Sequence, residues 1–484
     1  MPSSPAASSA TAATADDLAT LPSRERYSGL IWLVAASFFM QSLDSTIVNT
    51  AVPAVAAALR ETPLNMRSAL TSYVLTLAIL IPATPWLCDR FGTRRVFGAA
   101  ISVFAIGSLL CGLSQTLQEL VLARVLQGIG GAALMPVGRY ILVRTIDKRD
   151  FVQVMSTVST FGLLGSVLGP LLGGALVEYA NWRLIFLINV PVGIVGVWLN
   201  YREMPEYRLE TAHRFDLFGF MLFAASSALL LTASEFAADA TVRWGQMGLL
   251  VALAIAFGAS YVWHSHRTQY PVADLTLLRV RSVWVALSGN LLTRLGVSGM
   301  FLLIVLFLQV GCGWSPMAAG LMMVPQALGS ICCKWLVNRT LVRLGYRRLL
   351  FGNTLIVAAL LAMFALLGPH TPIALITLLV FVYGGFMGTQ YTVMNTLIYA
   401  DLDVKHASMA SSMASTTQYL SMSFGIALAT ILMQTLLHGQ NNEAYVAAFR
   451  WTVVVLAVIT AVASRVFARL DKTPPTGQRV SSTA

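Results

Sequence analysis

Two stretches of the same pattern decide the architecture of this chain: Asp89-Arg90-Phe91-Gly92-Thr93-Arg94-Arg95 and Val342-Arg343-Leu344-Gly345-Tyr346-Arg347-Arg348. Their central glycines lie 253 positions apart (345 minus 92). At the same offset, Thr62-Pro63-Leu64 aligns with Ser315-Pro316-Met317. Both matches flank a long apolar run, so the shared offset predicts an internal repeat rather than two coincidences.

The segments around these stretches are too apolar for a water-soluble domain. Of the 484 residues, 57% are apolar and 11% are charged, whereas an average globular chain carries about 25% charged residues. The apolar residues form blocks of roughly 20, the length that crosses a bilayer as a helix. The sequence therefore predicts an all-α polytopic membrane protein with transmembrane helices at 30–57, 68–88, 96–113, 119–143, 153–177, 183–200, 216–236, 244–264, 282–309, 316–336, 347–367, 372–397, 407–435 and 446–468.

The basic residues between these fourteen helices predict the orientation. With the N-terminal side placed inside, the inner segments hold 23 Lys and Arg residues and the outer segments hold five. Positively charged loops resist translocation, so we expect both termini in the cytoplasm. The formal net charge of +11 then reflects topology and gives no reason to expect a nucleic-acid partner.

The repeat also predicts the domain organisation. We expect a disordered cytoplasmic tail at 1–26, a six-helix half at 27–200, a linker with two inserted helices at 201–281, a second six-helix half at 282–470 and a cytoplasmic tail at 471–484. Parallel repeats about an axis along the membrane normal are a transporter architecture, and its substrate site lies between the halves.

Several kinds of chemistry are excluded by what the chain lacks. None of its four lysines follows a glycine, so there is no GxxxxGK[ST] phosphate loop for ATP. There is no HExxH, no CxxC and no pair of buried ligands spaced for a metal. We expect no catalytic residue, no metal and no cofactor. A membrane-embedded enzyme is thereby disfavoured, whereas a transporter, a receptor or a channel remains open.

Four motifs resemble those of a known family. They are Leu43-Asp44-Ser45-Thr46-Ile47-Val48-Asn49-Thr50-Ala51-Val52-Pro53, the loop at 89–95, Arg124-Val125-Leu126-Gln127-Gly128-Ile129-Gly130-Gly131, and Gly165-Ser166-Val167-Leu168-Gly169-Pro170-Leu171-Leu172-Gly173-Gly174. Together they resemble the 14-span drug:proton antiporters of the major facilitator superfamily over nearly all of 27–470. The loop motif of that family usually opens with glycine, and here Pro85 stands in that place. The resemblance implies the major facilitator fold and proton-coupled multidrug efflux.

Two charged residues in the apolar helices are the candidates for proton coupling. Asp44 lies about 14 residues into the first helix, roughly 21 Å from its cytoplasmic end. A carboxylate at that depth is costly unless it is hydrated, paired or protonated, so it should face a cavity and could carry a proton. Arg124 is the expected coupling partner. The alternatives are an Asp44 that only bonds to Ser42, Ser45 or Thr46, and an Arg124 that snorkels to the interface.

The resemblance also implies a gate and a packing motif. Asp89, with Arg90, Gly92, Arg94 and Arg95, is expected to pair across the cytoplasmic mouth when that mouth closes, although basic inner loops are common to all polytopic proteins. Small residues at Gly165, Gly169, Gly173 and Gly174 allow close helix approach, and Pro170 kinks the helix. Tight packing alone explains those glycines equally well.

Arg294 bears on the choice of substrate. It lies about 12 residues into the ninth helix, and the offset of 253 maps Asp44 to position 297, one helical turn away. We therefore expect Arg294 to face Asp44 across the substrate cavity, where Gln309, Asn395 and Gln418 could orient a ligand. One acid against up to four bases within the helices suits an anion such as a citrate-like carboxylate better than a cation.

The sequence therefore favours a proton-coupled exporter of small molecules in a bacterial inner membrane, working by alternating access. Its expected partners are a small-molecule substrate, protons and membrane lipid. Export of organic anions is the alternative, and uptake by proton symport is a further one, because transport direction is not encoded in these motifs.

Overall fold

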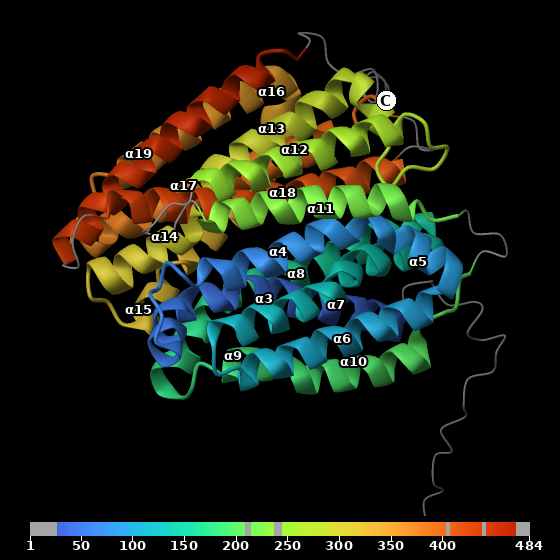
Figure 1. Cartoon of the computed structure of the whole chain (residues 1–484), viewed down its shortest axis with the longest axis horizontal. Helices are drawn as coiled ribbons and strands as arrows, with labels where there is room; N and C mark the ends of the chain where they lie inside the picture. The colour runs from blue at the N-terminus through green and yellow to red at the C-terminus, as the bar shows by residue number, and fades with distance from the viewer. Residues whose placement is uncertain (1–26, 209–213, 237–243, 403–406, 438–441, 471–484) are drawn as a thin grey trace, which may run out of the picture.

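A computed structural model describes the chain except residues 1–26, 209–213, 237–243, 403–406, 438–441 and 471–484. The described part is a bundle of long helices that lie side by side (Figure 1), and fourteen of its segments are long and apolar enough to cross a membrane. The predicted fold class is confirmed. The expected tails lie outside the described residues.

The first six spans form one packed group, the first half. Helix α4 continues through a short 3-10 turn into α5, and α8 packs along α3. The elements are α3 (Ser28–Leu59), α4 (Arg67–Leu80), η1 (Ile81–Ala83), α5 (Thr84–Phe91), α6 (Thr93–Leu113), α7 (Leu117–Thr145), α8 (Lys148–Tyr179), α9 (Leu184–Leu187) and α10 (Asn189–Glu203).

The last six spans form the second half. Its first span is interrupted after Val297 and again by the π-helical turn η3. The tenth and eleventh spans of the whole chain run together in α16. The elements are η2 (Leu275–Arg279), α13 (Arg281–Val297), α14 (Met300–Leu306), η3 (Phe307–Gly311), α15 (Pro316–Leu321), α16 (Val324–Phe364), α17 (Ile373–Leu397), α18 (Ala407–Leu436) and α19 (Asn442–Phe467).

The two halves repeat the same packing. Helix α3 packs on α8 and α6 on α7 in the first half, and α13 packs on α18 and α16 on α17 in the second. The repeat extends to the backbone: Gly92 separates α5 from α6 at φ 90°, and Gly345 bends α16 at φ 71°. Residues with a side chain rarely adopt these backbone angles, so glycine is required at both turns. We call the end of the bundle with these turns the Gly92 end.

The halves meet along two seams. One joins α4 to α18, and the other joins α8 to α15 and α16. The inserted helices α11 (Leu217–Phe236) and α12 (Trp244–Ser265) pack on each other, and α11 also contacts α4 and α18 (Figure 1). Asp216 and His264 join the inserted pair, with Nε2 and Oδ1 2.7 Å apart.

Candidate functional site

An ion pair lies buried in the middle of the first half. Nη1 of Arg124 on α7 is 2.9 Å from Oδ2 of Asp44 on α3. The side chain of Asp44 is 0% exposed and that of Arg124 is 2% exposed. Removing two charges from water is favourable only where each charge is paired and hydrogen-bonded, so the rest of the carboxylate also needs partners.

Those partners are two amides, which a serine hydroxyl in turn holds in place. Gln127 Nε2 donates to Asp44 Oδ1 at 2.8 Å, and Asn189 Nδ2 donates to the same oxygen at 3.3 Å. Ser108 Oγ accepts from both amides and donates to the carbonyl of Phe186. Helices α3, α6, α7 and α10 thus converge on one carboxylate, which holds the first half together at its centre.

The structure brings together the two residues expected to couple protons. It differs from the sequence-based expectation in the surroundings of Asp44, which we expected to face an open cavity. The carboxylate is instead enclosed, because Arg124, Gln127 and Asn189 occupy the positions that water would take. A proton can reach it only through a rearrangement of these groups.

The flat face of the Arg124 guanidinium and its Nε atom make further contacts. Its guanidinium lies 4.2 Å from the ring centre of Tyr73 on α4 and 5.7 Å from that of Phe186. Its Nε donates to the carbonyl of Ala69 at 3.4 Å. The aromatic faces stabilise the cation, so Arg124 remains charged in an apolar core.

Arg294 on α13 is the second buried arginine of interest. It is 6% exposed. Its Nε donates to Asn290 Oδ1 at 2.5 Å, and its guanidinium lies 3.9 Å from the ring centre of Tyr391 on α17. Within the described residues it forms no ion pair, and the carboxylate of Asp44 is bound by other groups. No bond joins Arg294 to Asp44 among the described residues, and the expectation that Arg294 faces Asp44 across a substrate cavity stays a prediction.

The other candidate cavity residues differ in their exposure and in their contacts. Gln309 Nε2 donates to the carbonyl of Thr50 at 2.9 Å and so bridges the two halves. Asn395 near the end of α17 is exposed, and Gln418 on α18 is half-buried. No hydrogen bond joins Gln309, Asn395 or Gln418 to Arg294 among the described residues, so their place in a substrate cavity stays a prediction.

Polar contacts join the halves at the end opposite to the Gly92 end, which we call the Gly174 end. Arg67 Nη1 of α4 donates to Gln434 Oε1 of α18 at 2.7 Å. Glu178 Oε2 of α8 accepts from the backbone N–H of Met317 in α15 at 2.9 Å. With the contact between Gln309 and Thr50, these bonds hold both seams together at this end.

The glycine motif of α8 serves two contacts. A Cβ atom added at Gly169 would collide with the hydroxyl of Thr46 on α3, and one at Gly173 with the hydroxyl of Thr50. A Cβ at Gly165 would collide with the backbone of Phe39 and would also approach that of Leu43. A Cβ at Gly174 would instead lie 2.5 Å from the carbonyl oxygen of Pro316 in the other half. Pro170 interrupts the backbone hydrogen bonding of α8, and its carbonyl approaches Gly320 in the other half.

The loop motif makes its described contacts within the first half. Asp89 Oδ1 accepts from the hydroxyl of Tyr140 on α7 at 2.9 Å, and Arg94 Nε donates to the carbonyl of Met204 at 2.6 Å. Arg90 and Arg95 are exposed. Among the described residues, no hydrogen bond or ion pair of this motif crosses to the second half, so the expected gating contact stays a prediction.

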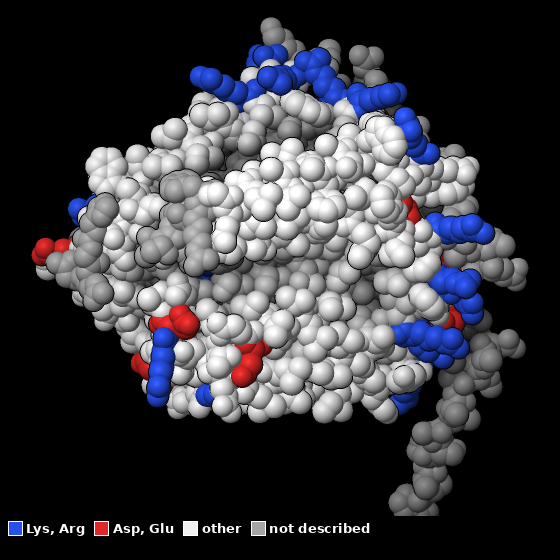
Figure 2. All heavy atoms as spheres, in the orientation of Figure 1, with Lys and Arg blue, Asp and Glu red and all other residues white. Residues whose placement is uncertain are grey.

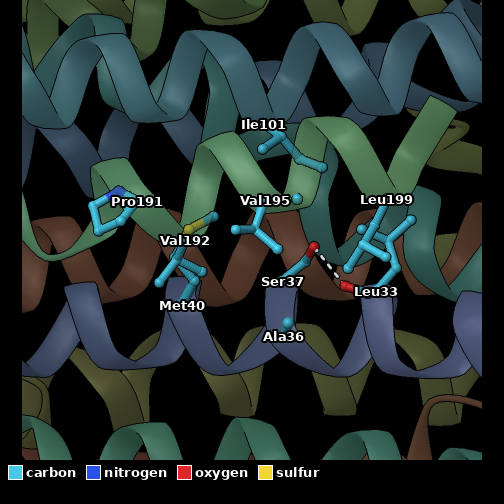
Figure 3. Close-up of a pocket in the computed structure, with 10 residues that line it drawn as sticks. Leu33, Ala36, Ser37, Met40, Ile101, Pro191, Val192, Val195 and Leu199 are labelled. Carbon is cyan, nitrogen blue, oxygen red and sulfur yellow. Dashed lines mark hydrogen bonds between the residues drawn. The ribbon is translucent and has the colours of Figure 1, made fainter. Parts of the chain in front are cut away.

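A cavity of about 320 Å³ lies away from all of these residues. Figure 3 shows that α3 contributes Leu33, Ser37 and Met40, while α10 contributes Val192 and Val195. The hydroxyl of Ser37 donates to the carbonyl of Leu33 (Figure 3), which leaves an apolar lining. This cavity offers no charged group to orient a substrate.

Sequence reasoning missed four residues of the central network, Gln127, Asn189, Tyr73 and Ser108. Gln127 lies one helical turn from Arg124 inside the same motif, so helical spacing could have identified it. Asn189 and Tyr73 reach the site from α10 and α4, and no local signal in the sequence marks them.

Comparison with known proteins identifies the family. The model of the Major Facilitator Superfamily matches residues 34–426. The chain belongs to this superfamily of transporters. It is 40% identical over 454 residues to "Putative multidrug resistance protein MdtD" of Serratia proteamaculans, which covers 93% of this chain and 95% of that protein. The protein of the same name from Klebsiella pneumoniae strain 342 is 42% identical, over 93% of this chain and 96% of its own length.

Solved structures show the same fold. An autoinhibited peptide transporter of the POT family superposes with a TM-score of 0.67 at 15% identity, over 92% of this chain and 98% of its own. A bacterial homologue of the human lysosomal transporter Spinster superposes with a TM-score of 0.63 at 14% identity, over 91% of this chain and 96% of its own. The chain is therefore an integral membrane protein with a transporter fold.

Proposed function

We propose that this protein is a proton-coupled secondary transporter that exports small molecules by alternating access of its halves. The observation that carries the proposal is the fully buried pair of Asp44 and Arg124, in a chain without a phosphate loop for ATP. Adding one proton to Asp44 removes a buried ion pair, so it changes the relative energies of two conformations. The names of the relatives, which refer to multidrug resistance, support drug:proton antiport.

We propose further that both termini lie in the cytoplasm of a bacterial cell, with the protein in the inner membrane. Lys and Arg gather at the Gly92 end in Figure 2, in agreement with 23 basic residues in the segments on that side and five on the other. The Gly174 end then faces outward. Its bonds between the halves support a state closed to the outside, in which Asp89 bonds to Tyr140 of its own half and, among the described residues, to no group of the second half.

The test of the proton site is Asp44→Asn in proteoliposomes with an internal pH dye. We expect this variant to lose ethidium transport driven by a proton gradient, because the amide cannot exchange a proton. Glu119→Gln, which changes an exposed carboxylate at the Gly174 end of α7, should transport as the unmodified protein does. Gradient-driven transport retained by Asp44→Asn would refute the assignment.

Export of organic anions is the second candidate function, and Arg294 favours it. Its cation is buried without a described carboxylate partner, whereas the charge of Arg124 is balanced by Asp44. In the same vesicles, we expect Arg294→Ala to lose citrate transport and keep ethidium transport if anions are the substrate. Unchanged transport of both compounds would remove Arg294 from the substrate site.

The same vesicles also measure whether the substrate moves with the proton flux or against it. An antiporter moves the substrate against the proton flux, whereas a symporter for uptake moves both together. The sign of the pH change on addition of the transported compound therefore separates export by antiport from the third candidate, uptake by proton symport.

A further inference from the structure

The hydroxyl of Tyr73 is an anomaly of the central network. Tyr73 is 1% exposed, and its hydroxyl has no hydrogen-bond partner among the described residues. Burying a hydroxyl without a partner costs about 1–3 kcal/mol. Gly131 on α7 leaves the hydroxyl its space, since a Cβ there would lie 3.2 Å from it. An unused acceptor at this position suggests that it is used in another state.

The ring of Tyr73 lies against the one group that needs such an acceptor. Arg124 bonds through Nη1 to both Asp44 and Gln127, while its face lies on the ring at 4.2 Å. Arginine does not lose its proton in proteins. When Asp44 takes up a proton, the buried guanidinium therefore stays charged and loses its counter-ion.

We propose that the Tyr73 hydroxyl is the second binding position of the Arg124 side chain and is occupied when Asp44 is protonated. A proton adds to Asp44 Oδ2, the ion pair with Nη1 breaks, and the guanidinium slides along the ring until an N–H donates to Tyr73 Oη. Tyr73 is thus a positioning residue. The inference rests on the proposed role of Asp44 as the proton site.

This position links the ion pair to the second half. Tyr419 of α18 packs against the apolar cluster that contains Tyr73, and Ser423 Oγ of the same helix donates to the carbonyl of Thr71 at 3.2 Å. The slide therefore moves the positive charge of Arg124 toward the hydroxyl of a residue that shares an apolar cluster with Tyr419, at the seam of α4 and α18.

Few other groups can account for a titration here. Cys111 of α6 and Tyr419 of α18 are the other titratable groups that interact with Tyr73, besides Asp44 and Arg124. Gln127 of α7, Asn189 of α10 and Phe186 of α9, which also contact Asp44 or Arg124, carry no charge. Asp44 is therefore the one carboxylate among these described groups.

Infrared spectroscopy of the full-length protein tests the inference without a substrate. The C=O stretch of protonated Asp44, identified by its loss in Asp44→Asn, is followed against pH in Tyr73→Phe. This variant keeps the ring and removes only the hydroxyl. Because the hydroxyl stabilises the protonated form alone, we expect the midpoint to fall by about one pH unit, which corresponds to about 1.4 kcal/mol.

The control is Tyr383→Phe, which removes the hydroxyl of a buried tyrosine whose ring packs against Phe364 in the second half. We expect no shift there. An unchanged or raised midpoint in Tyr73→Phe would overturn the second binding position and leave the proton site intact. If Asp44→Asn removes no pH-dependent carboxyl band, the proton site itself is wrong and the inference fails with it.

Discussion

At the scale of the residue, one buried carboxylate determines how four helices meet. Asp44 accepts hydrogen bonds from Arg124, Gln127 and Asn189, which come from α7 and α10. Such a pair contributes little net stability relative to apolar side chains of the same shape, but breaking it from one side leaves a bare charge. The cost of a substitution therefore depends on which partner remains.

This dependence gives a prediction for the pair. Arg124→Gln should destabilise the protein by about 3 kcal/mol at neutral pH, because Asp44 is left buried without its cation. Adding Asp44→Asn to that variant should recover most of the loss. Thermal unfolding in detergent measures both, with Arg202→Gln as the control, since Arg202 pairs with Glu203 at the surface and such pairs contribute about 0–1 kcal/mol. A double variant less stable than Arg124→Gln would contradict this account.

At the scale of the element, the glycine turns at 92 and 345 fix where helices break in both halves. Each has a positive φ with an extended ψ, which costs a residue with a Cβ about 1–3 kcal/mol. A Cβ at Gly345 would meet no atom within 4 Å, so only the backbone cost applies there.

Gly345→Ala should therefore lower the free energy of unfolding by about 1–3 kcal/mol. Gly352→Ala is the matched control, since Gly352 lies within α16, has ordinary helical angles and also has nothing within 4 Å of an added Cβ. That substitution should stabilise by up to about 1 kcal/mol. Equal effects at the two positions, read from unfolding in detergent, would show that the bend at 345 carries no strain.

The elements were more predictable than the site. Spans are encoded locally by about 20 apolar residues, and the offset of 253 found from seven-residue motifs reappears as matching turns at Gly92 and Gly345. Asp44 and Arg124 could be identified because charge within apolar helices is costly. Asn189 could not, since it lies 145 positions from Asp44 and meets it only through packing. The sequence predicts Arg294 within the ninth helix, where α13 contains it, but its contacts with Asn290 and Tyr391 depend on tertiary packing.

At the scale of the whole molecule, the bonds at the Gly174 end must break if the halves rock. Arg67 and Gln434 join α4 to α18 there. Covalent closure of the same seam should therefore stop transport while leaving each half intact.

A reducible cross-linker between cysteines at 67 and 434, in a background without the five native cysteines, should abolish transport in vesicles, and reduction should restore it. The matched control joins cysteines at 226 and 258, because Ser226 of α11 lies next to Gly258 of α12 and this link does not cross between the halves. Transport by the cross-linked protein at 67 and 434 would show that this seam stays closed throughout the cycle.

Both members of the buried ion pair belong to the same half, Asp44 on α3 and Arg124 on α7. The mobile unit is thus electrically neutral at this point while Asp44 is ionised, and it carries one positive charge once Asp44 holds a proton. The membrane potential then acts on the step in which the half moves with Asp44 protonated, and not on the step in which it moves with Asp44 ionised. About 2.3 kcal/mol is available per charge for each 100 mV. A negative cell interior would pull the protonated form inward, so the membrane potential would supply driving force in addition to the pH difference.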